Sequence, residues 1–65
     1  MTLQKIIETV SNSTILLEDI PAAKDILLNE IAACQTVVQD NETQFHIRME
    51  YQSYLRLYTK LLHRL

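Results

Sequence analysis

Few side chains in this chain have the types and spacing that chemistry requires, and the most suggestive group surrounds His46. Glu42 and Glu50 each lie four residues from His46, so a helix would place all three on one face. Carboxylates beside an imidazole can raise its pKa or contribute to a metal site. A zinc site needs three or four good ligands, and only His63 and Cys34 remain. We therefore expect a solvated helix face and no bound metal.

The other reactive side chains do not form a catalytic arrangement. The single cysteine, Cys34, has Ile31 and Val38 as neighbours on an apolar stripe, which predicts a small buried hydrophobe and not a nucleophile. The chain contains no glycine, which excludes a glycine-rich phosphate loop, a nucleophile elbow and a dinucleotide-binding fingerprint. The serine, histidine and aspartate residues do not follow an order that indicates a catalytic triad. We expect no enzymatic activity and no cofactor.

Apolar and aromatic side chains in the last third of the chain predict a protein-binding surface instead. Tyr51, Tyr54 and Tyr58 repeat at i, i+3 and i+7, and they fit either a core with hydroxyls at its rim or an interface. Phe45 and Met49 form an i, i+4 pair on the opposite side of the same helix, and three coverings are open: the first helix, a second copy or a foreign partner. The candidate partner-binding residues are Phe45, Met49, Tyr51, Tyr54, Leu55, Tyr58 and Leu62.

Charge is unevenly distributed along the chain. Residues 1–41 hold six acids and two bases, whereas residues 42–65 hold two acids, four bases and both histidines. A basic cluster falls near the end, at Arg56, Lys60, His63 and Arg64, with no aromatic residue interleaved on its own face. The net charge of −2 argues against nucleic-acid binding, so we expect these cations to lie at a solvated helix terminus.

A helix must position the candidate binding residues. Eight apolar residues between Ile47 and Leu65 fall within an arc of about 120°, which is broad enough to pack against two neighbouring elements. Asn41 is the expected N-cap, and Gln44 is the return half of a capping box. These features predict a helix over residues 42–63.

A second helix is predicted over residues 21–39. Leu27 begins an apolar series with steps of 4, 3 and 4, and Asp19 is the expected N-cap before Pro21 in the first turn. The break at Asp40 and Asn41 would then reverse the chain. The two helices are therefore expected to form an antiparallel hairpin with a short loop.

The N-terminal segment allows two interpretations. Leu3, Ile6, Ile7, Val10 and Leu17 share one helical face, but residues 11–14 are four poor helix formers. One interpretation is a continuous helix over residues 2–18. The other is a short helix that ends near Val10 and is followed by an irregular turn. In either case the fold class is all-α: a hairpin with an additional N-terminal helix, in one domain over residues 1–65.

The length of the chain points to a partner. A domain of 65 residues buries only about 60% of the surface that its unfolded form exposes, so an isolated monomer would be marginally stable. The lone cysteine fits a reducing compartment. No signal peptide is evident, and no apolar run approaches the roughly 18 residues that span a bilayer. We expect a soluble cytoplasmic protein that does not insert into membranes.

The sequence also resembles a known family. The start MTLQKIIETV, an acidic, alanine-containing middle helix, a short polar break and the Gln44-Phe45 step before the final helix are similar to the small E-type co-chaperones of bacterial type III secretion needle subunits. The resemblance implies a chaperone function: such a protein binds a larger helical-repeat chaperone, and the pair keeps the needle subunit soluble. The alternative is a small regulatory or phage-encoded inhibitor that acts on a host protein as a helical dimer.

Overall fold

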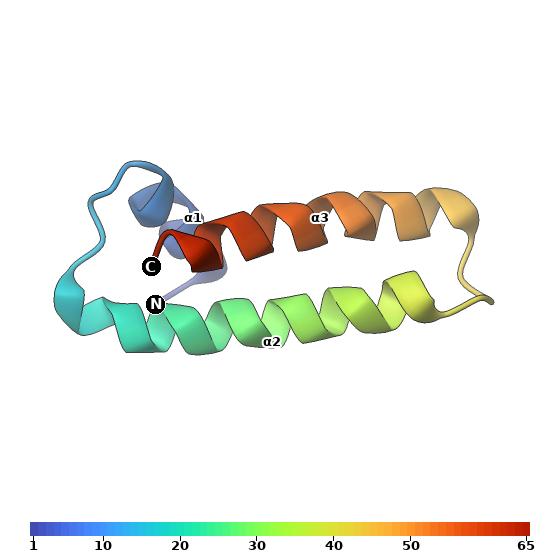
Figure 1. The fold of residues 1–65 in the computed structure, drawn as a ribbon, viewed down its shortest axis with the longest axis horizontal. Helices are drawn as coiled ribbons and strands as arrows, with labels where there is room; N and C mark the ends of the chain where they lie inside the picture. The colour runs from blue at the N-terminus through green and yellow to red at the C-terminus, as the bar shows by residue number, and fades with distance from the viewer.

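The protein is an antiparallel helical hairpin with a short helix packed on one end. A computed structural model describes all residues from Met1 to Leu65. In chain order the elements are α1 (Leu3–Ser11), a 3-10 turn η1 (Leu17–Asp19), α2 (Ile20–Gln39) and α3 (Phe45–His63). Helices α2 and α3 run side by side, and α1 lies at the end that holds both chain termini (Figure 1). The all-α class and the hairpin with an additional helix are confirmed.

The short version of the first helix is the correct interpretation. The hydroxyl of Thr2 caps α1 by accepting a hydrogen bond from the amide of Lys5 at 3.2 Å. After Ser11 the chain turns, and Ser13 adopts a positive φ of 57°, which a helix cannot accommodate. Leu17 therefore does not continue the apolar face of α1 but lies exposed in η1.

The second helix agrees with its predicted bounds to within one residue. It begins at Ile20 with Pro21 in its first turn, where a missing N–H costs no hydrogen bond. Asp19 occupies the N-cap position, but its side chain makes no capping hydrogen bond. Its backbone instead continues the 3-10 turn, with φ −90° and ψ −12°.

The predicted start of the third helix is wrong by three residues. The carboxylate of Asp40 accepts hydrogen bonds from the amide of Glu42 at 3.0 Å and from the hydroxyl of Thr43 at 3.1 Å, which holds this stretch in a turn. Gln44 is extended at ψ 143° and makes no side-chain cap, so the expected capping box does not form. Helix α3 consequently begins at Phe45.

Arg48 connects the two arms of the hairpin at the loop. Its Nε donates a hydrogen bond of 3.1 Å to the carbonyl oxygen of Val38. That carbonyl belongs to the last turn of α2, where no intrahelical donor remains. Because the donor is charged, this bond is stronger than one between neutral groups.

Removal of this bond should destabilise the hairpin. We expect Arg48→Met to lower the free energy of unfolding by about 1.5–3 kcal/mol, since it keeps most of the apolar stem but leaves the carbonyl of Val38 without its donor. Urea unfolding followed by circular dichroism measures the change. Arg56→Met, on the exposed side of the same helix, is the matched control and should change stability by less than about 0.5 kcal/mol. Equal effects of the two variants would contradict this role for Arg48.

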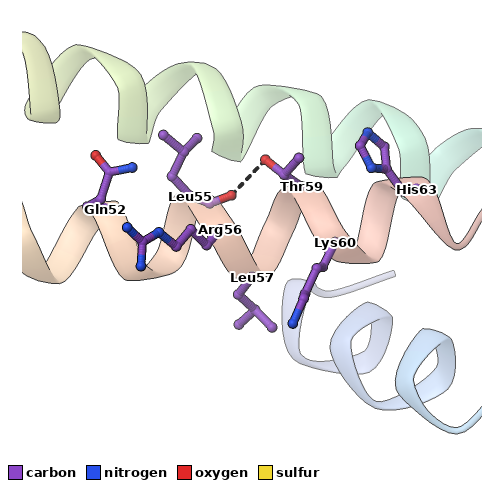
Figure 2. A pocket seen from close by; sticks show the side chains of 7 residues that line it. All are labelled: Gln52, Leu55, Arg56, Leu57, Thr59, Lys60 and His63. Atoms are coloured by element: carbon purple, nitrogen blue, oxygen red, sulfur yellow. Dashed lines mark hydrogen bonds between the residues drawn. The ribbon is translucent and has the colours of Figure 1, made fainter.

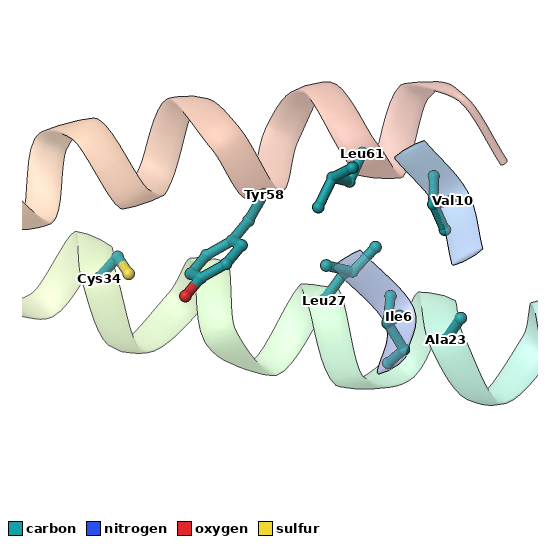
Figure 3. Packing of buried hydrophobic residues seen from close by; sticks show 7 residues of the cluster. All are labelled: Ile6, Val10, Ala23, Leu27, Cys34, Tyr58 and Leu61. Atoms are coloured by element: carbon teal, nitrogen blue, oxygen red, sulfur yellow. The ribbon is translucent and has the colours of Figure 1, made fainter. Parts of the chain in front are cut away.

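The core occupies the end of the hairpin that α1 covers. Seven residues are buried, and five of them gather where the three helices meet (Figure 3): Ile6, Val10, Ala23, Leu27 and Leu61. Cys34 and Tyr58 lie farther along, between α2 and α3 alone. Helix α1, with 9 residues against the 20 of α2, lies at the end of the hairpin that holds the chain termini (Figure 1). The loop end of the hairpin therefore has no third helix packed against it.

Candidate functional site

The predicted partner-binding residues divide into three groups by burial. Phe45, Met49 and Tyr54 are exposed, with 72% of the surface of Phe45 and 51% of that of Met49 accessible. Three more are half-buried against the core: Tyr51, Leu55 and Leu62. Tyr58 is buried. The structure thus brings only part of the predicted set to the surface.

The rings of the three tyrosines pack against one another along α3. The rings of Tyr51 and Tyr54 meet edge to face with centroids 5.7 Å apart, and Tyr54 stacks on Tyr58 at 6.3 Å. The hydroxyl of Tyr54 donates a hydrogen bond of 3.0 Å to the carboxylate of Glu50, which raises the pKa of Tyr54. For Tyr58 the structure supports the core interpretation, whereas Tyr54 remains free to contact another molecule.

Tyr58 and Cys34 are neighbours in the centre of the hairpin. The ring of Tyr58 points from α3 toward α2, and the Cys34 side chain lies between the same two helices (Figure 3). Burial raises the pKa of both groups, and the negative charge of Glu30 adds to the shift in each case. Cys34 is therefore a protonated, buried thiol, as the sequence predicts.

These raised pKa values predict a loss of stability at alkaline pH. Because the folded state holds its protons more tightly than the unfolded state, its advantage is complete below the unfolded pKa values and is lost as the pH rises above them. We expect the free energy of unfolding to fall from about pH 8.5, where an unfolded thiol ionises, and further above about pH 10, where tyrosine ionises. Urea unfolding at a series of pH values measures this.

Cys34→Ala separates the two contributions. The variant should show a flat profile up to about pH 9.5, because only the tyrosine component remains. A decline from pH 8.5 that is the same in both proteins would show that Cys34 is not its source.

Six residues of α3, all exposed except the half-buried Gln52, share one side of the helix. Steps of 4, 3, 4, 4 and 3 place six side chains on one helical face, and we call them the outer stripe: Phe45, Met49, Gln52, Arg56, Lys60 and His63. A shallow, open depression covers its C-terminal part (Figure 2). In this view Arg56 lies at the front of the helix, Leu55 points toward α2, and Leu57 and Lys60 point toward α1. The stripe is apolar at its N-terminal end and cationic at its C-terminal end.

The relation between the two ends of the stripe was missed by sequence reasoning. Helical spacing alone puts Phe45 and Met49 on the same face of α3 as Arg56 and Lys60, although sequence reasoning treats the apolar pair and the basic cluster as separate features. Phe45 lies at the other end of this face from Arg56 and Lys60, so no aromatic residue alternates with these cations. Neither residue is buried, so the first helix does not bring this pair into the core.

Three other apolar residues were also missed as features of the surface or core. Ala23 is fully buried among the side chains of the three-helix junction, a position that apolar spacing among larger residues does not reveal. Leu28 and Leu57 are exposed on α2 and α3. A helical projection would have placed Leu28 outside the apolar stripe of α2.

The other candidate residue, His46, is not part of a metal site. His46 is exposed, and no group of three or more histidine, cysteine, aspartate or glutamate side chains is arranged to hold a metal ion. None of the helices combines the length and hydrophobicity that a bilayer-spanning segment requires. Comparisons with known protein families, with curated proteins and with solved structures found no match to this chain.

Proposed function

We propose that this chain is a non-enzymatic protein-binding module that acts as a small co-chaperone. It would use α3 to bind a larger helical chaperone in the cytoplasm, and together they would keep a type III secretion needle subunit soluble. The observation that carries the proposal is the exposure of Phe45 and Met49 side by side on the outer stripe, where both side chains are more than half accessible. An adjacent aromatic and thioether pair of this kind is typical of residues that bury on binding.

The arrangement of the helices supports the proposal. Because α1 packs on one end of the hairpin, the end near the loop consists of only two helices. Tyr54 is exposed in this half, and its hydroxyl can stay hydrated or bonded to Glu50 while the ring contacts a partner. Binding of a partner to the folded form would also stabilise a small, marginal domain by mass action.

Size-exclusion chromatography with light scattering tests the proposal directly. The chain is measured alone and after co-expression with the products of neighbouring genes. We expect a stable complex with a helical component of a secretion apparatus. A well-folded monomer that captures none of these products would contradict the proposal. A discrete homodimer that excludes them would instead support the alternative of a regulatory or phage-encoded inhibitor.

A further inference from the structure

We propose that the outer stripe of α3 binds an acidic amphipathic helix, with apolar side chains over Phe45 and Met49 and carboxylates over Arg56 and Lys60. This inference rests on the proposed function and specifies the chemistry of the partner. It follows from the order of side chains along one exposed face, where the apolar and the cationic ends are about three turns apart.

The apolar end of the stripe indicates that the partner presents apolar side chains to it. Phe45 is 72% exposed and Met49 51% exposed, so most of Phe45 and about half of Met49 stay open to a partner. Phenylalanine and methionine present adaptable apolar surface, and helix-in-groove partners fill such surface with residues at i and i+4. Leucine or isoleucine at two successive turns of a partner helix matches this spacing.

The cationic end determines the charge of the partner. Arg56 and Lys60 are exposed, and the shallow depression between the side chains of Arg56, Lys60 and His63 offers room for a docked side chain. The stripe contains no carboxylate, so these cations have no counter-charge on their own face. Acidic residues on the partner would supply it.

A second copy of the chain is a poor occupant of the same face. Parallel pairing of two outer stripes would bring Arg56 and Lys60 of both copies together, and like charges repel. Antiparallel pairing would place these cations over Phe45 and Met49, which offer no negative charge. The acidic partner helix satisfies both ends at once.

Anionic lipids and nucleic acid fit the stripe less well than a protein does. The whole chain carries a net charge of −2, and only two arginine or lysine residues lie on the stripe. Binding to phosphate backbones is driven by many cations and the release of many counterions. A protein helix with two carboxylates needs only two cations, and the stripe provides Arg56 and Lys60.

A designed pair of peptides tests the inference on the intact chain. The probe is a terminally blocked helical peptide with glutamates four residues apart in its first turns and leucines four residues apart on the same face near its end. Antiparallel docking would place its leucines over Phe45 and its glutamates over Arg56, and the acidic start suits the helix dipole. The control peptide has the same composition, with both glutamates moved to the opposite face.

The readout is the chemical-shift perturbation of isotope-labelled protein. We expect shifts confined to the outer stripe and at least about fivefold weaker binding of the control peptide, since exposed ion pairs contribute up to about 1 kcal/mol each. The double variant Arg56→Gln, Lys60→Gln should lose the same factor. Lys5→Gln and Lys24→Gln, exposed cations on α1 and α2, are the matched controls and should bind as the unaltered chain does.

Three outcomes would overturn the inference. These are equal binding of both peptides, shifts that lie outside the stripe, and binding of a single-stranded RNA or of phosphatidylglycerol vesicles to the stripe in place of the peptide. If a co-expressed partner is captured while the peptide fails, the protein-binding function stands and only the acidic-helix assignment falls. If the peptide binds but no partner is captured, the co-chaperone proposal is the one that fails.

Discussion

Replacement of Leu27 with alanine is expected to remove most of the stability of this protein. Leu27 is fully buried where α1, α2 and α3 meet, and it contributes one of the two largest fully buried side chains. A buried leucine truncated to alanine costs about 2–5 kcal/mol, because apolar burial is lost and a cavity remains. A single domain of this size rarely has more than about 3–5 kcal/mol in total. Thermal and urea unfolding should therefore show a variant that is largely unfolded at 37 °C.

The adjacent leucine provides the control. Leu28 is 52% exposed on the same helix, so Leu28→Ala removes little buried surface and creates no cavity. It should change the free energy of unfolding by less than about 0.5 kcal/mol. Similar losses in both variants would mean that the junction of the three helices is not the core of the protein.

Phe45→Asp is expected to abolish partner binding without unfolding the chain. Phe45 is the most exposed of the predicted binding residues, and aromatic anchors at interfaces often cost 2 kcal/mol or more when removed, which is about a 30-fold loss of affinity. It is also the first residue of α3, where a negative charge suits the helix dipole. The melting temperature should consequently stay the same or rise slightly.

The measurement compares the affinity of each variant for the co-expressed partner with its melting temperature. Leu28→Asp is the matched control, because it places the same charge at an exposed leucine on α2, away from the outer stripe. Binding that survives Phe45→Asp, or that is lost equally in both variants, would argue against α3 as the docking surface. Tyr54→Ala distinguishes a second contact: a fall in melting temperature with unchanged affinity would assign Tyr54 to the fold alone.

The bounds of α2 could be predicted from sequence because its signals are local. Pro21 is tolerated only near a helix start, and the series from Leu27 to Val38 repeats at helical spacing up to the Asp40 break. The start of α3 could not be predicted in the same way. The Asp40 carboxylate competes for the amide of Glu42 and turns the chain through Thr43, which moves the start to Phe45.

The burial of the tyrosines could not be predicted from periodicity. Tyr54 and Tyr58 lie on the same apolar face of α3, yet Tyr58 is buried and Tyr54 is exposed. The difference is tertiary, because the ring of Tyr58 points toward α2, on which Cys34 lies, whereas the ring of Tyr54 stays exposed. Helix α1 ends at Ser11, among the poor helix formers at residues 11–14, and Ser13 adopts a positive φ just beyond it.

Unlike the burial of the tyrosines, the six positions of the outer stripe can be predicted from helical spacing once α3 is known. What required the structure was the finding that Phe45 and Met49 are both exposed, which turns an apolar pair into a candidate docking surface. Phe45 and Met49 are large apolar side chains that the folded chain of 65 residues leaves in contact with water.

Site-specific photo-cross-linking tests the central claim, that the outer stripe is where a protein partner docks. A photoreactive phenylalanine analogue is placed at Phe45 in one protein and at Leu28 in another, and each is co-expressed with the neighbouring gene products and irradiated. We expect the analogue at position 45 to cross-link to a larger helical protein and the one at position 28 not to do so. Cross-links formed only from position 28, or only between copies of this chain, would contradict this claim.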